Sequence, residues 1–305
     1  MDRPELSTVA ELLKPITWFP PMWAFACGVV SSGKPLFESW GLIIWGILLA
    51  GPMVCATSQA VNDWFDRHVD AINEPNRPIP SGRMPGKWGL YIAVLWTGLS
   101  LIWAWQLGTW GFAASGLGLF LAWAYSAPPL RLKANGWWGN SACALSYEGL
   151  AWITGAAVML GGAMPPEATV ILALLFSLGA HGIMTLNDFK AVEGDAQMGV
   201  RSLPVQMGVT KAAWTACAFM LGAQLAVVAL LMQWGMTNAA LAVLMLSFAQ
   251  LPLMFRFVQQ PIERALSVSA FGVPLFVSGM MVSAWSLYGD TFLRYNKFNK
   301  EEKLE

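Results

Sequence analysis

Residues 212–232 read AAWTACAFMLGAQLAVVALLM, a stretch of the chain without a single charged side chain. About 20 apolar residues in a helix cross the hydrocarbon core of a bilayer, and a helix satisfies all of its own backbone polar groups there. This stretch therefore predicts a membrane-spanning helix. Mostly apolar segments of similar length occur at 16–32, 40–60, 88–107, 109–126, 140–160, 168–186, 238–257 and 266–288. The expected fold is all-α and polytopic, with about nine transmembrane helices, and a tight turn is expected at Gly108 between two of them.

The composition of the 305 residues supports this fold class. Hydrophobic residues make up 56% and charged residues only 12%, against about 25% charged in soluble domains. We expect one transmembrane domain over residues 1–305, with segments 1–15 and 290–305 outside the bilayer. The net charge is zero, so no basic field points to nucleic acid as a partner. The four cysteines lie in apolar runs, which favours buried thiols over disulfides or zinc ligands.

The basic residues predict the orientation in the membrane. With nine spans, 13 of the 18 Lys and Arg residues fall on the side of the N-terminus, where the long connections at about 61–87 and 187–211 also lie. Basic residues accumulate on the cytoplasmic side of membrane proteins. We therefore expect these connections in the cytoplasm, although the basic C-terminal tail falls on the other side. Long ordered connections on one face often carry function.

An acidic motif opens the first long connection. It reads Asn62-Asp63-Trp-Phe-Asp66-Arg-His-Val-Asp70 and leads to Arg77-Pro-Ile-Pro. The three aspartates are spaced i, i+3, i+7, so on a helix they share one face. Three carboxylates at the C-terminal end of a helix repel one another and the helix dipole, which favours a hard cation such as Mg²⁺ as their partner. Magnesium commonly shares its coordination shell with phosphate, so a phosphorylated ligand is expected.

A second acidic motif repeats the order of the first. Asn187-Asp188 follows Asn62-Asp63 at a shift of 125, and Arg201-Ser-Leu-Pro follows Arg77-Pro-Ile-Pro at a shift of 124. Gly194, before Asp195, makes one unbroken helix through both aspartates doubtful. Two similar halves would bring the acidic motifs around one central cavity, with one metal at each bridging a diphosphate. The alternative is that these residues are solvated helix ends and that the nearby cations only fix topology.

The two motifs, together with Tyr125-Ser-Ala-Pro-Pro-Leu-Arg131-Leu-Lys133, resemble the UbiA-type intramembrane prenyltransferase superfamily over about residues 15–290. Within it they are most similar to the chlorophyll and bacteriochlorophyll synthase branch. Many members of the superfamily carry a compact D-x-x-x-D second motif, whereas this chain has Val192 at the corresponding position. Which of Glu193 and Asp195 reaches a metal is therefore left open.

The resemblance implies Mg²⁺-dependent transfer of a geranylgeranyl or phytyl group from its diphosphate to the propionate carboxylate of bacteriochlorophyllide, or of chlorophyllide. It assigns metal binding to the acidic motifs: Asn62, Asp63, Asp66, Asp70, Asp188, Glu193 and Asp195, with the five aspartates as the catalytic set. It assigns diphosphate binding to nearby polar and basic residues: Asn62, Arg77, Arg131, Lys133, Asn187, Lys190 and Arg201. It also implies a bacterial inner or intracytoplasmic photosynthetic membrane, a cytoplasmic active site, and pigment-biosynthesis or photosystem assembly proteins as partners.

Three further residues are predicted to contact the pigment. His181 lies seven residues before Asp188, hence on the same helix face, and could ligate the chlorin's magnesium or orient its propionate. Glu148 lies inside a predicted span, where ionisable groups usually face a cavity. Tyr125 belongs to the third motif. The alternatives are a hydrogen-bonded interior histidine for His181 and simple helix pairing for Glu148.

Other functions fit the sequence less well. A transporter of an anionic lipid or pigment would place its acids near the bilayer midplane, whereas these lie at helix ends. A pigment-binding assembly protein would need several intramembrane histidines, but the chain has two, and His68 lies in the acidic motif. A quinone-precursor ring as acceptor would need a base to remove a proton, whereas a carboxylate is already ionised at neutral pH.

Overall fold

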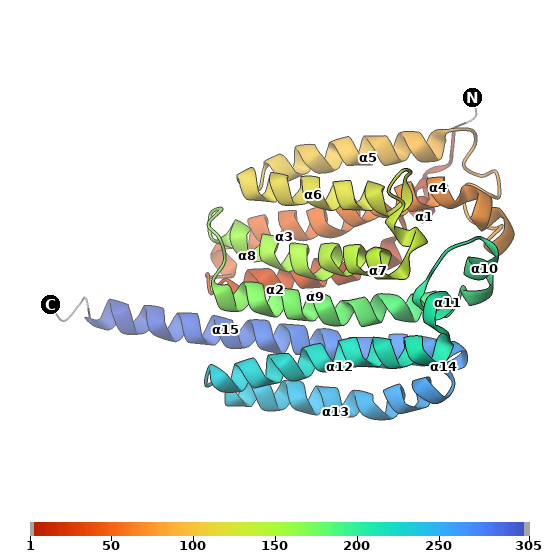
Figure 1. Ribbon diagram of the computed structural model, residues 1–305. Coiled ribbons are helices and arrows are strands. Elements are labelled where there is room, and N and C mark those ends of the chain that lie inside the picture. The colour runs from red at the N-terminus through yellow and green to blue at the C-terminus, as the bar shows by residue number, and fades with distance from the viewer. Residues whose placement is uncertain (1–2, 302–305) are drawn as a thin grey trace.

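The computed structural model describes residues 3–301, which form a bundle of long, nearly parallel helices (Figure 1). Within that range there is one isolated β-bridge, between Asn135 and Arg201, and no strand. The α-helices are α1 (Leu6–Leu13), α2 (Phe19–Ser31), α3 (Trp40–Leu48), α4 (Ala56–Asn73), α5 (Trp88–Trp105), α6 (Gly108–Ser126), α7 (Gly136–Ala144), α8 (Ala151–Met159), α9 (Glu167–Asp188), α10 (Val192–Gln197), α11 (Leu203–Met207), α12 (Val209–Gln233), α13 (Thr237–Gln259), α14 (Pro261–Ser267) and α15 (Val273–Glu301).

Three π-helical turns join pairs of these helices into continuous rods. They are η3 (Leu49–Cys55), between α3 and α4, η5 (Leu145–Leu150), between α7 and α8, and η6 (Val268–Gly272), between α14 and α15. Short 3-10 turns, η1 (Pro15–Thr17), η2 (Phe37–Ser39) and η4 (Leu132–Ala134), lie in connections. π-helical turns are rare in proteins, and those that occur often lie at functional sites.

The all-α, membrane-spanning fold is confirmed, but the count of nine spans is not. Among the described residues, seven helical segments are long and apolar enough to cross a membrane. Helix α2 is apolar but has only 13 residues. Helix α6 is absent from the seven because its glycines, tryptophans and tyrosine lower its hydropathy. Each expected span nevertheless coincides with a helix.

The boundaries differ most at the acidic motifs. The span expected at 40–60 continues to Asn73, so Asp63, Asp66 and Asp70 lie on helix α4 rather than in a connection. Residues 53–73 contain neither Gly nor Pro, so nothing local ends the helix earlier. The predicted break between Asp188 and Asp195 is confirmed, although it falls at 189–191, before Gly194. The turn at Gly108 is confirmed too, with φ +75°.

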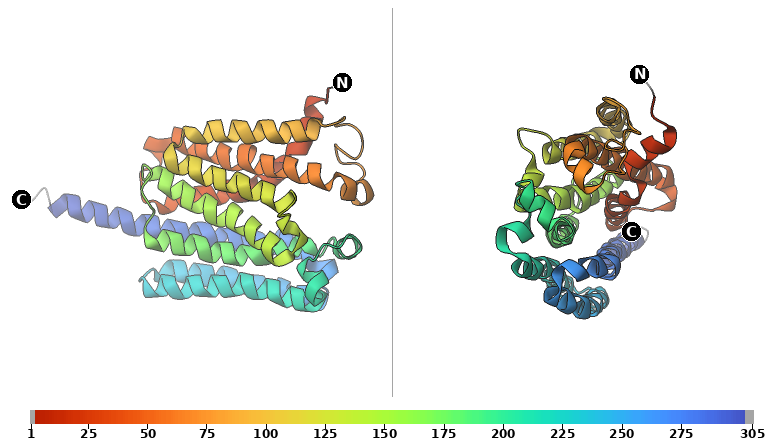
Figure 2. Two further views of the ribbon diagram at one scale, coloured as in Figure 1. Left: turned by 45° about the horizontal axis from the view of Figure 1, so that its top comes forward. Right: turned by 90° about the vertical axis from the view of Figure 1, so that its right-hand side faces the viewer.

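Close helix packing depends on glycine where α2 crosses α8. A Cβ added to Gly28 would lie 1.9 Å from the carbonyl oxygen of Trp152, and one added to Gly155 would lie 2.2 Å from that of Phe25. Small residues let two backbones approach in this way inside membranes. Helix α9 lies between the N-terminal helices and the layer of α12, α13 and α15 (Figure 2).

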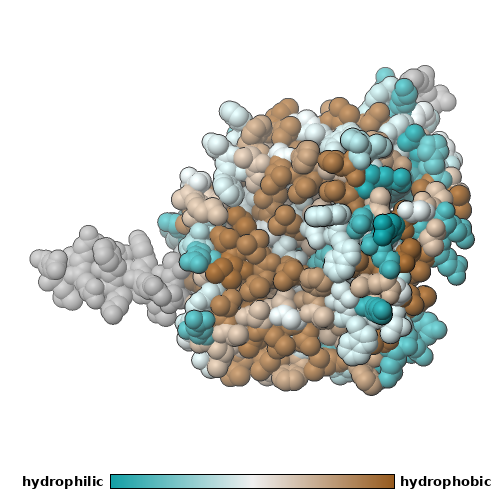
Figure 3. Space-filling view, in the orientation of Figure 1, coloured by the Kyte–Doolittle hydropathy of each residue, from teal (hydrophilic) through white to brown (hydrophobic). Residues whose placement is uncertain are grey.

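The irregular segments gather at one end of the bundle. There the connections after α4 and α6 lie near α10 and α11, at the same end as helix α1 (Figure 1). The surface is largely apolar along the helices, and its polar side chains are concentrated at this end (Figure 3). The expected outer segment 1–15 contains helix α1, which packs against α4 and buries Leu12 and Leu13. Helix α15 continues to Glu301, and positions 302–305 of the expected tail lie outside the described residues.

Candidate active site

The first acidic motif is buried and paired with cations from other segments. Asp63 is 1% exposed, and its Oδ1 accepts a hydrogen bond from Lys14 Nζ at 2.5 Å. Arg77 Nη1 lies 3.5 Å from the same oxygen and donates to Asp70 Oδ2 at 2.8 Å. Burial opposes the charge of Arg77, but the Asp63 and Asp70 carboxylates outweigh it and raise the pKa of the guanidinium. These contacts place Asp63 and Asp70 on one face of α4, as the spacing predicted.

Asp66, on the same helix face, pairs with the third motif. Its Oδ1 accepts a hydrogen bond from Lys133, and its Oδ2 accepts one from Asn62 Nδ2 at 3.0 Å. Asn62 also donates to Ser126 Oγ, at 3.3 Å, at the end of α6. Burial lowers the pKa of the Lys133 ammonium, and the adjacent Asp66 carboxylate opposes that shift. The Lys133 side chain is therefore a desolvated cation held at the first acidic motif.

The second acidic motif is held by helix α7. Asn140 Nδ2 donates to Asp188 Oδ2 at 3.0 Å and to Thr185 Oγ1 at 3.3 Å. Asp195 is half-buried on α10, and burial raises the pKa of its carboxyl, with a further contribution from the negative charge of Asp66. Asp195 therefore lies within electrostatic reach of the first motif, whereas the neighbouring Glu193 is exposed.

A short backbone pairing attaches the third motif to the second. The N–H of Gly136 donates to the carbonyl of Arg201 at 2.8 Å, and the N–H of Arg201 donates to the carbonyl of Ala134 at 2.9 Å. Gly136 is required here because a Cβ would lie 2.6 Å from the backbone nitrogen of Leu203. This pairing fixes the segment that carries Lys133 against the segment that follows Asp195.

The residues assigned to the diphosphate differ in their burial and contacts. Arg77 and Lys133 contact the first motif directly. Arg131 is half-buried in the third motif and adopts φ +37°, whereas Asn187, Lys190 and Arg201 are exposed. Sequence reasoning missed Lys14, the nearest cation to Asp63. Its signal was weak, since it is a single lysine directly before the proline that precedes the first span.

The carboxylate and amide oxygens of the cluster are of the type that binds magnesium ions. Among the described residues, no three His, Cys, Asp or Glu side chains lie close enough to hold a metal without other ligands. However, Asp63 Oδ2 is buried and has no hydrogen-bond partner within the described part of the chain, which leaves a desolvated acceptor at the cluster. Magnesium commonly takes one or two carboxylates and completes its shell with water and phosphate. The aspartates and Asn62 supply that kind of donor set.

A long apolar cavity begins beside this cluster. Its volume is about 220 Å³, and it is lined by α2, α3, η3, α4, α6, α7, η5 and α8. It runs from Asn62 and Tyr125 at the cluster to Gly46 and Phe25, and the sixteen residues from Gly46 to Asn62 correspond to about 24 Å of helix axis. None of its described lining residues carries a charge. The cavity is therefore long, narrow and suited to a hydrocarbon chain.

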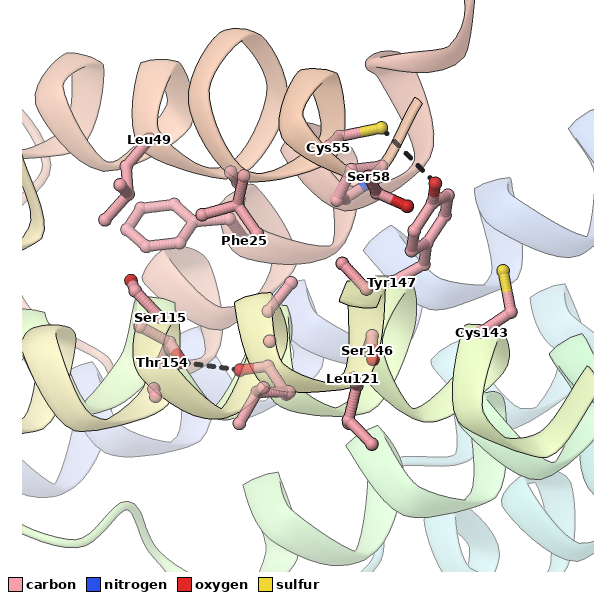
Figure 4. Close-up of a pocket in the computed structure, with 18 of the residues that line it drawn as sticks. Phe25, Leu49, Cys55, Ser58, Ser115, Leu121, Cys143, Ser146, Tyr147 and Thr154 are labelled. Carbon is pink, nitrogen blue, oxygen red and sulfur yellow. Dashed lines mark hydrogen bonds between the residues drawn. The ribbon is translucent and has the colours of Figure 1, made fainter. Parts of the chain in front are cut away.

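A few polar groups interrupt the apolar wall. Tyr147 Oη accepts hydrogen bonds from Gln59 Nε2 at 3.2 Å and from Cys55 Sγ at 3.4 Å (Figure 4). These contacts join η5 to the rod formed by η3 and α4 along one side of the cavity. Sequence reasoning did not single out these residues, because each is ordinary within its own helix.

The three predicted pigment contacts have different surroundings. Tyr125 lines the cavity near the cluster. His181 is 3% exposed, its Nδ1 is 3.1 Å from Ser141 Oγ, and its ring is stacked on Trp137 with a centroid separation of 5.6 Å. Glu148 is also 3% exposed, lies in η5, and does not line the cavity. His181 Nε2 and Glu148 Oε2 are buried without a hydrogen-bond partner.

Comparison with known proteins identifies the family. Residues 17–288 match the model of the UbiA prenyltransferase family. The chain belongs to the UbiA prenyltransferase family. The bacteriochlorophyll synthase 33 kDa chain of Rhodobacter capsulatus is 53% identical over 94% of this chain and 95% of its own length. The corresponding Cereibacter sphaeroides protein is 54% identical, over 94% of each chain.

Solved structures of UbiA proteins share the fold. A UbiA homologue from Archaeoglobus fulgidus bound to GPP and Mg²⁺ superposes with a TM-score of 0.67, at 19% sequence identity, over 92% of this chain and 99% of that one. At this identity the likeness concerns the fold alone. It agrees with the helical bundle and the multi-pass membrane location that the sequence predicted.

Proposed function

We propose that this protein esterifies bacteriochlorophyllide with a geranylgeranyl or phytyl group taken from the corresponding diphosphate, in a magnesium-dependent reaction. The observation that carries the proposal is the uncharged cavity that ends at a cluster of buried carboxylates and cations. A prenyl diphosphate has the same division into a long apolar chain and a compact anion. The acceptor follows from relatives named bacteriochlorophyll synthase at 53% and 54% identity.

The diphosphate would lie between the two acidic motifs. Arg77 and Lys133, now paired with Asp70 and Asp66, are placed to contact its oxygens. Asp63 and Asp66 of the first motif, with the Asp188–Asp195 pair of the second, would hold magnesium. Bound magnesium would neutralise negative charge on the leaving diphosphate. Asn62, Arg131 and the exposed Asn187, Lys190, Glu193 and Arg201 stay predictions at the margin of this site.

The reaction balances without a general base. The bond between C1 of the allylic chain and the diphosphate oxygen breaks, and its electron pair leaves with the diphosphate. An oxygen of the acceptor carboxylate forms the new bond to C1. A carboxylate with a pKa of about 4 is ionised at neutral pH, so no proton has to be removed. Fixed cations such as Lys133 and Arg77 stabilise the charge that develops on the leaving group.

The cavity protects the reacting carbon. A prenyl chain seated from Tyr125 towards Phe25 places C1 at the cluster and its hydrocarbon among apolar side chains. Exclusion of water there prevents capture of the allylic cation as an alcohol. The polar end of the bundle, with both acidic motifs, would face the cytoplasm of a bacterial inner or intracytoplasmic photosynthetic membrane, as the basic residues predict. Binding to pigment-biosynthesis or assembly proteins stays a prediction.

The test is an esterification assay on detergent-solubilised protein. Bacteriochlorophyllide and chlorophyllide are offered separately with geranylgeranyl diphosphate, with and without Mg²⁺, to the wild type and to Asp63→Asn. Magnesium-dependent ester from bacteriochlorophyllide that is lost in Asp63→Asn is the expected result. Ester from chlorophyllide alone would change the acceptor and keep the mechanism. Absence of ester from both pigments, with folded protein, would contradict the proposed reaction.

A further inference from the structure

The wall of the cavity at the end farthest from the acidic cluster includes one phenylalanine ring. Phe25, from α2, is 2% exposed, and its side chain lies beside Leu49 and opposite Ser115 in the cavity wall (Figure 4). Leu49 is 3% exposed. Below this level, Phe25 belongs to a tightly packed group with Val29 and Met159. The open space therefore ends at the Phe25 ring rather than at the end of the helices.

The position of that ring depends on Gly46. A Cβ added to Gly46 would lie 2.0 Å from Cζ and 2.5 Å from Cε1 of Phe25. Side chains do not approach so closely, so any residue larger than glycine would displace the ring. The backbone of Phe25 is fixed independently, since its carbonyl lies against Gly155 of α8. A displaced ring would therefore have to turn about its side-chain bonds, and part of the space beside it is the cavity.

The helix continues past this level. Six residues separate Gly46 from Trp40, the first residue of α3, which corresponds to about 9 Å of further helix. The cavity thus stops within the length of the bundle, although the surrounding helices would allow a longer one. Between the cluster and Phe25 the wall contains many small residues, including Ala50, Ala114 and Gly118, and Phe25 is the one phenylalanine among its described lining residues.

We propose that the Phe25 ring, seated on Gly46, is a specificity-determining floor that limits the accepted isoprenoid chain to geranylgeranyl length. The inference rests on the proposed function, because it takes the cavity as the site of the prenyl chain. A shorter chain leaves part of the apolar wall unfilled and loses contact area. A longer chain meets the ring and cannot keep C1 at the cluster.

Two substitutions with opposite expected effects test the floor. Phe25→Ala removes the ring and should raise kcat/KM for geranylfarnesyl diphosphate relative to geranylgeranyl diphosphate by about 10-fold or more, the scale at which apolar pockets discriminate chain size. Gly46→Ala should push the ring towards the cluster and shift preference to farnesyl diphosphate. Ester products from an equimolar mixture of the three diphosphates are quantified by mass spectrometry. Phe276→Ala is the matched control, because Phe276 is fully buried and lies on α15, away from the cavity.

Dissociation constants of the three matching thiolodiphosphates are measured in parallel. The floor is supported if both variants shift the selectivity in opposite directions while Phe276→Ala keeps the wild-type ratios. Folded Phe25→Ala and Gly46→Ala proteins with unchanged ratios would overturn it. If the wild type forms no ester, the proposed function fails, and the analogue affinities still decide whether Phe25 limits chain length. If Phe25→Ala does not fold, Phe25→Leu replaces it, and a smaller shift towards geranylfarnesyl diphosphate is expected.

Discussion

Lys14 offers the sharpest test of the acidic cluster, because the structure and not the sequence assigns it there. Its ammonium lies 2.5 Å from Asp63 Oδ1, and the Asp63 side chain is 2% exposed. In Lys14→Met the aliphatic stem is kept and the charge is removed. Asp63 would then keep only Arg77, at 3.5 Å, while its Oδ2 is already without a partner.

The size of the effect follows from these contacts. Removing one partner of a fully buried ion pair typically lowers the free energy of unfolding by about 3–5 kcal/mol. The Lys14 side chain is 20% exposed and Arg77 still contributes, so we expect about 2 kcal/mol. This loss is expected in the free energy of unfolding; an equal loss of transition-state stabilisation, at about 1.36 kcal/mol per factor of ten, corresponds to a fall of roughly 30-fold in kcat/KM for the prenyl diphosphate. The cause is a carboxylate that is no longer held in place and no longer charge-balanced.

The assay is single-turnover esterification over a range of Mg²⁺ concentrations. The loss in Lys14→Met should diminish at high Mg²⁺, because the free cation can replace the missing charge, and Lys14→Arg should keep most of the activity. In thermal unfolding, Lys14→Met should destabilise an Asp63→Asn background by little more, since the two residues act as one pair. Lys87→Met, at an exposed lysine before α5, is the control. Full activity of Lys14→Met with an unchanged magnesium dependence would refute the reasoning, as would losses that add in the double variant.

Three further predictions concern the rest of the chain. Gly28→Val should prevent stable folding, because its Cβ would lie 1.9 Å from the carbonyl oxygen of Trp152; recovery of monodisperse protein at wild-type yield would contradict this. Gln224→Leu should cost about 1–3 kcal/mol in thermal or chemical unfolding, because the buried Gln250 amide loses its side-chain partner and keeps only a 3.3 Å hydrogen bond to the Leu246 carbonyl. The double Leu variant should recover most of that loss, and an additive loss would argue against the pairing. His181→Phe should bind magnesium-containing and magnesium-free bacteriochlorophyllide with similar affinity if the unpartnered Nε2 ligates the chlorin's metal; discrimination that persists in titrations followed by absorbance would exclude that role.

The part of the site that could be predicted from the sequence is the part fixed by local geometry. The i, i+3, i+7 spacing places Asp63, Asp66 and Asp70 on one helix face whatever surrounds them, and the structure has them there. The sequence predicted a role for Lys133 at the diphosphate, but it did not predict that Lys133 contacts Asp66. The spacing rule holds within one helix and carries no information about the residues that pack against it.

Contacts over long sequence separations could not be predicted. Lys14 and Asp63 are 49 residues apart and meet because helix α1 packs on α4. Nothing in the sequence near Lys14 distinguishes it from a lysine that only marks the membrane boundary. The assignment of Arg201 to the diphosphate stays a prediction, since its side chain is exposed and the contact that the structure shows is made by its backbone, which pairs with the third motif.

The internal repeat relates the two halves in sequence, but the structure uses them differently. The cavity is walled by helices of the N-terminal half and by the α7–α8 rod, and its lining, as far as the described residues go, includes no residue of α12, α13 or α15. In the C-terminal half, Phe176 of α9 packs edge-on against Phe276 of α15, and Gln224 of α12 pairs with Gln250 of α13. The acidic motifs follow the same division. The first lies on one unbroken helix that also lines the cavity, whereas the second is split between α9 and α10. An unbroken helix fixes the distance from the carboxylates to the cavity, which the proposed reaction at C1 of a prenyl chain requires. In the same proposal, the split second motif would approach the diphosphate without extending the cavity wall.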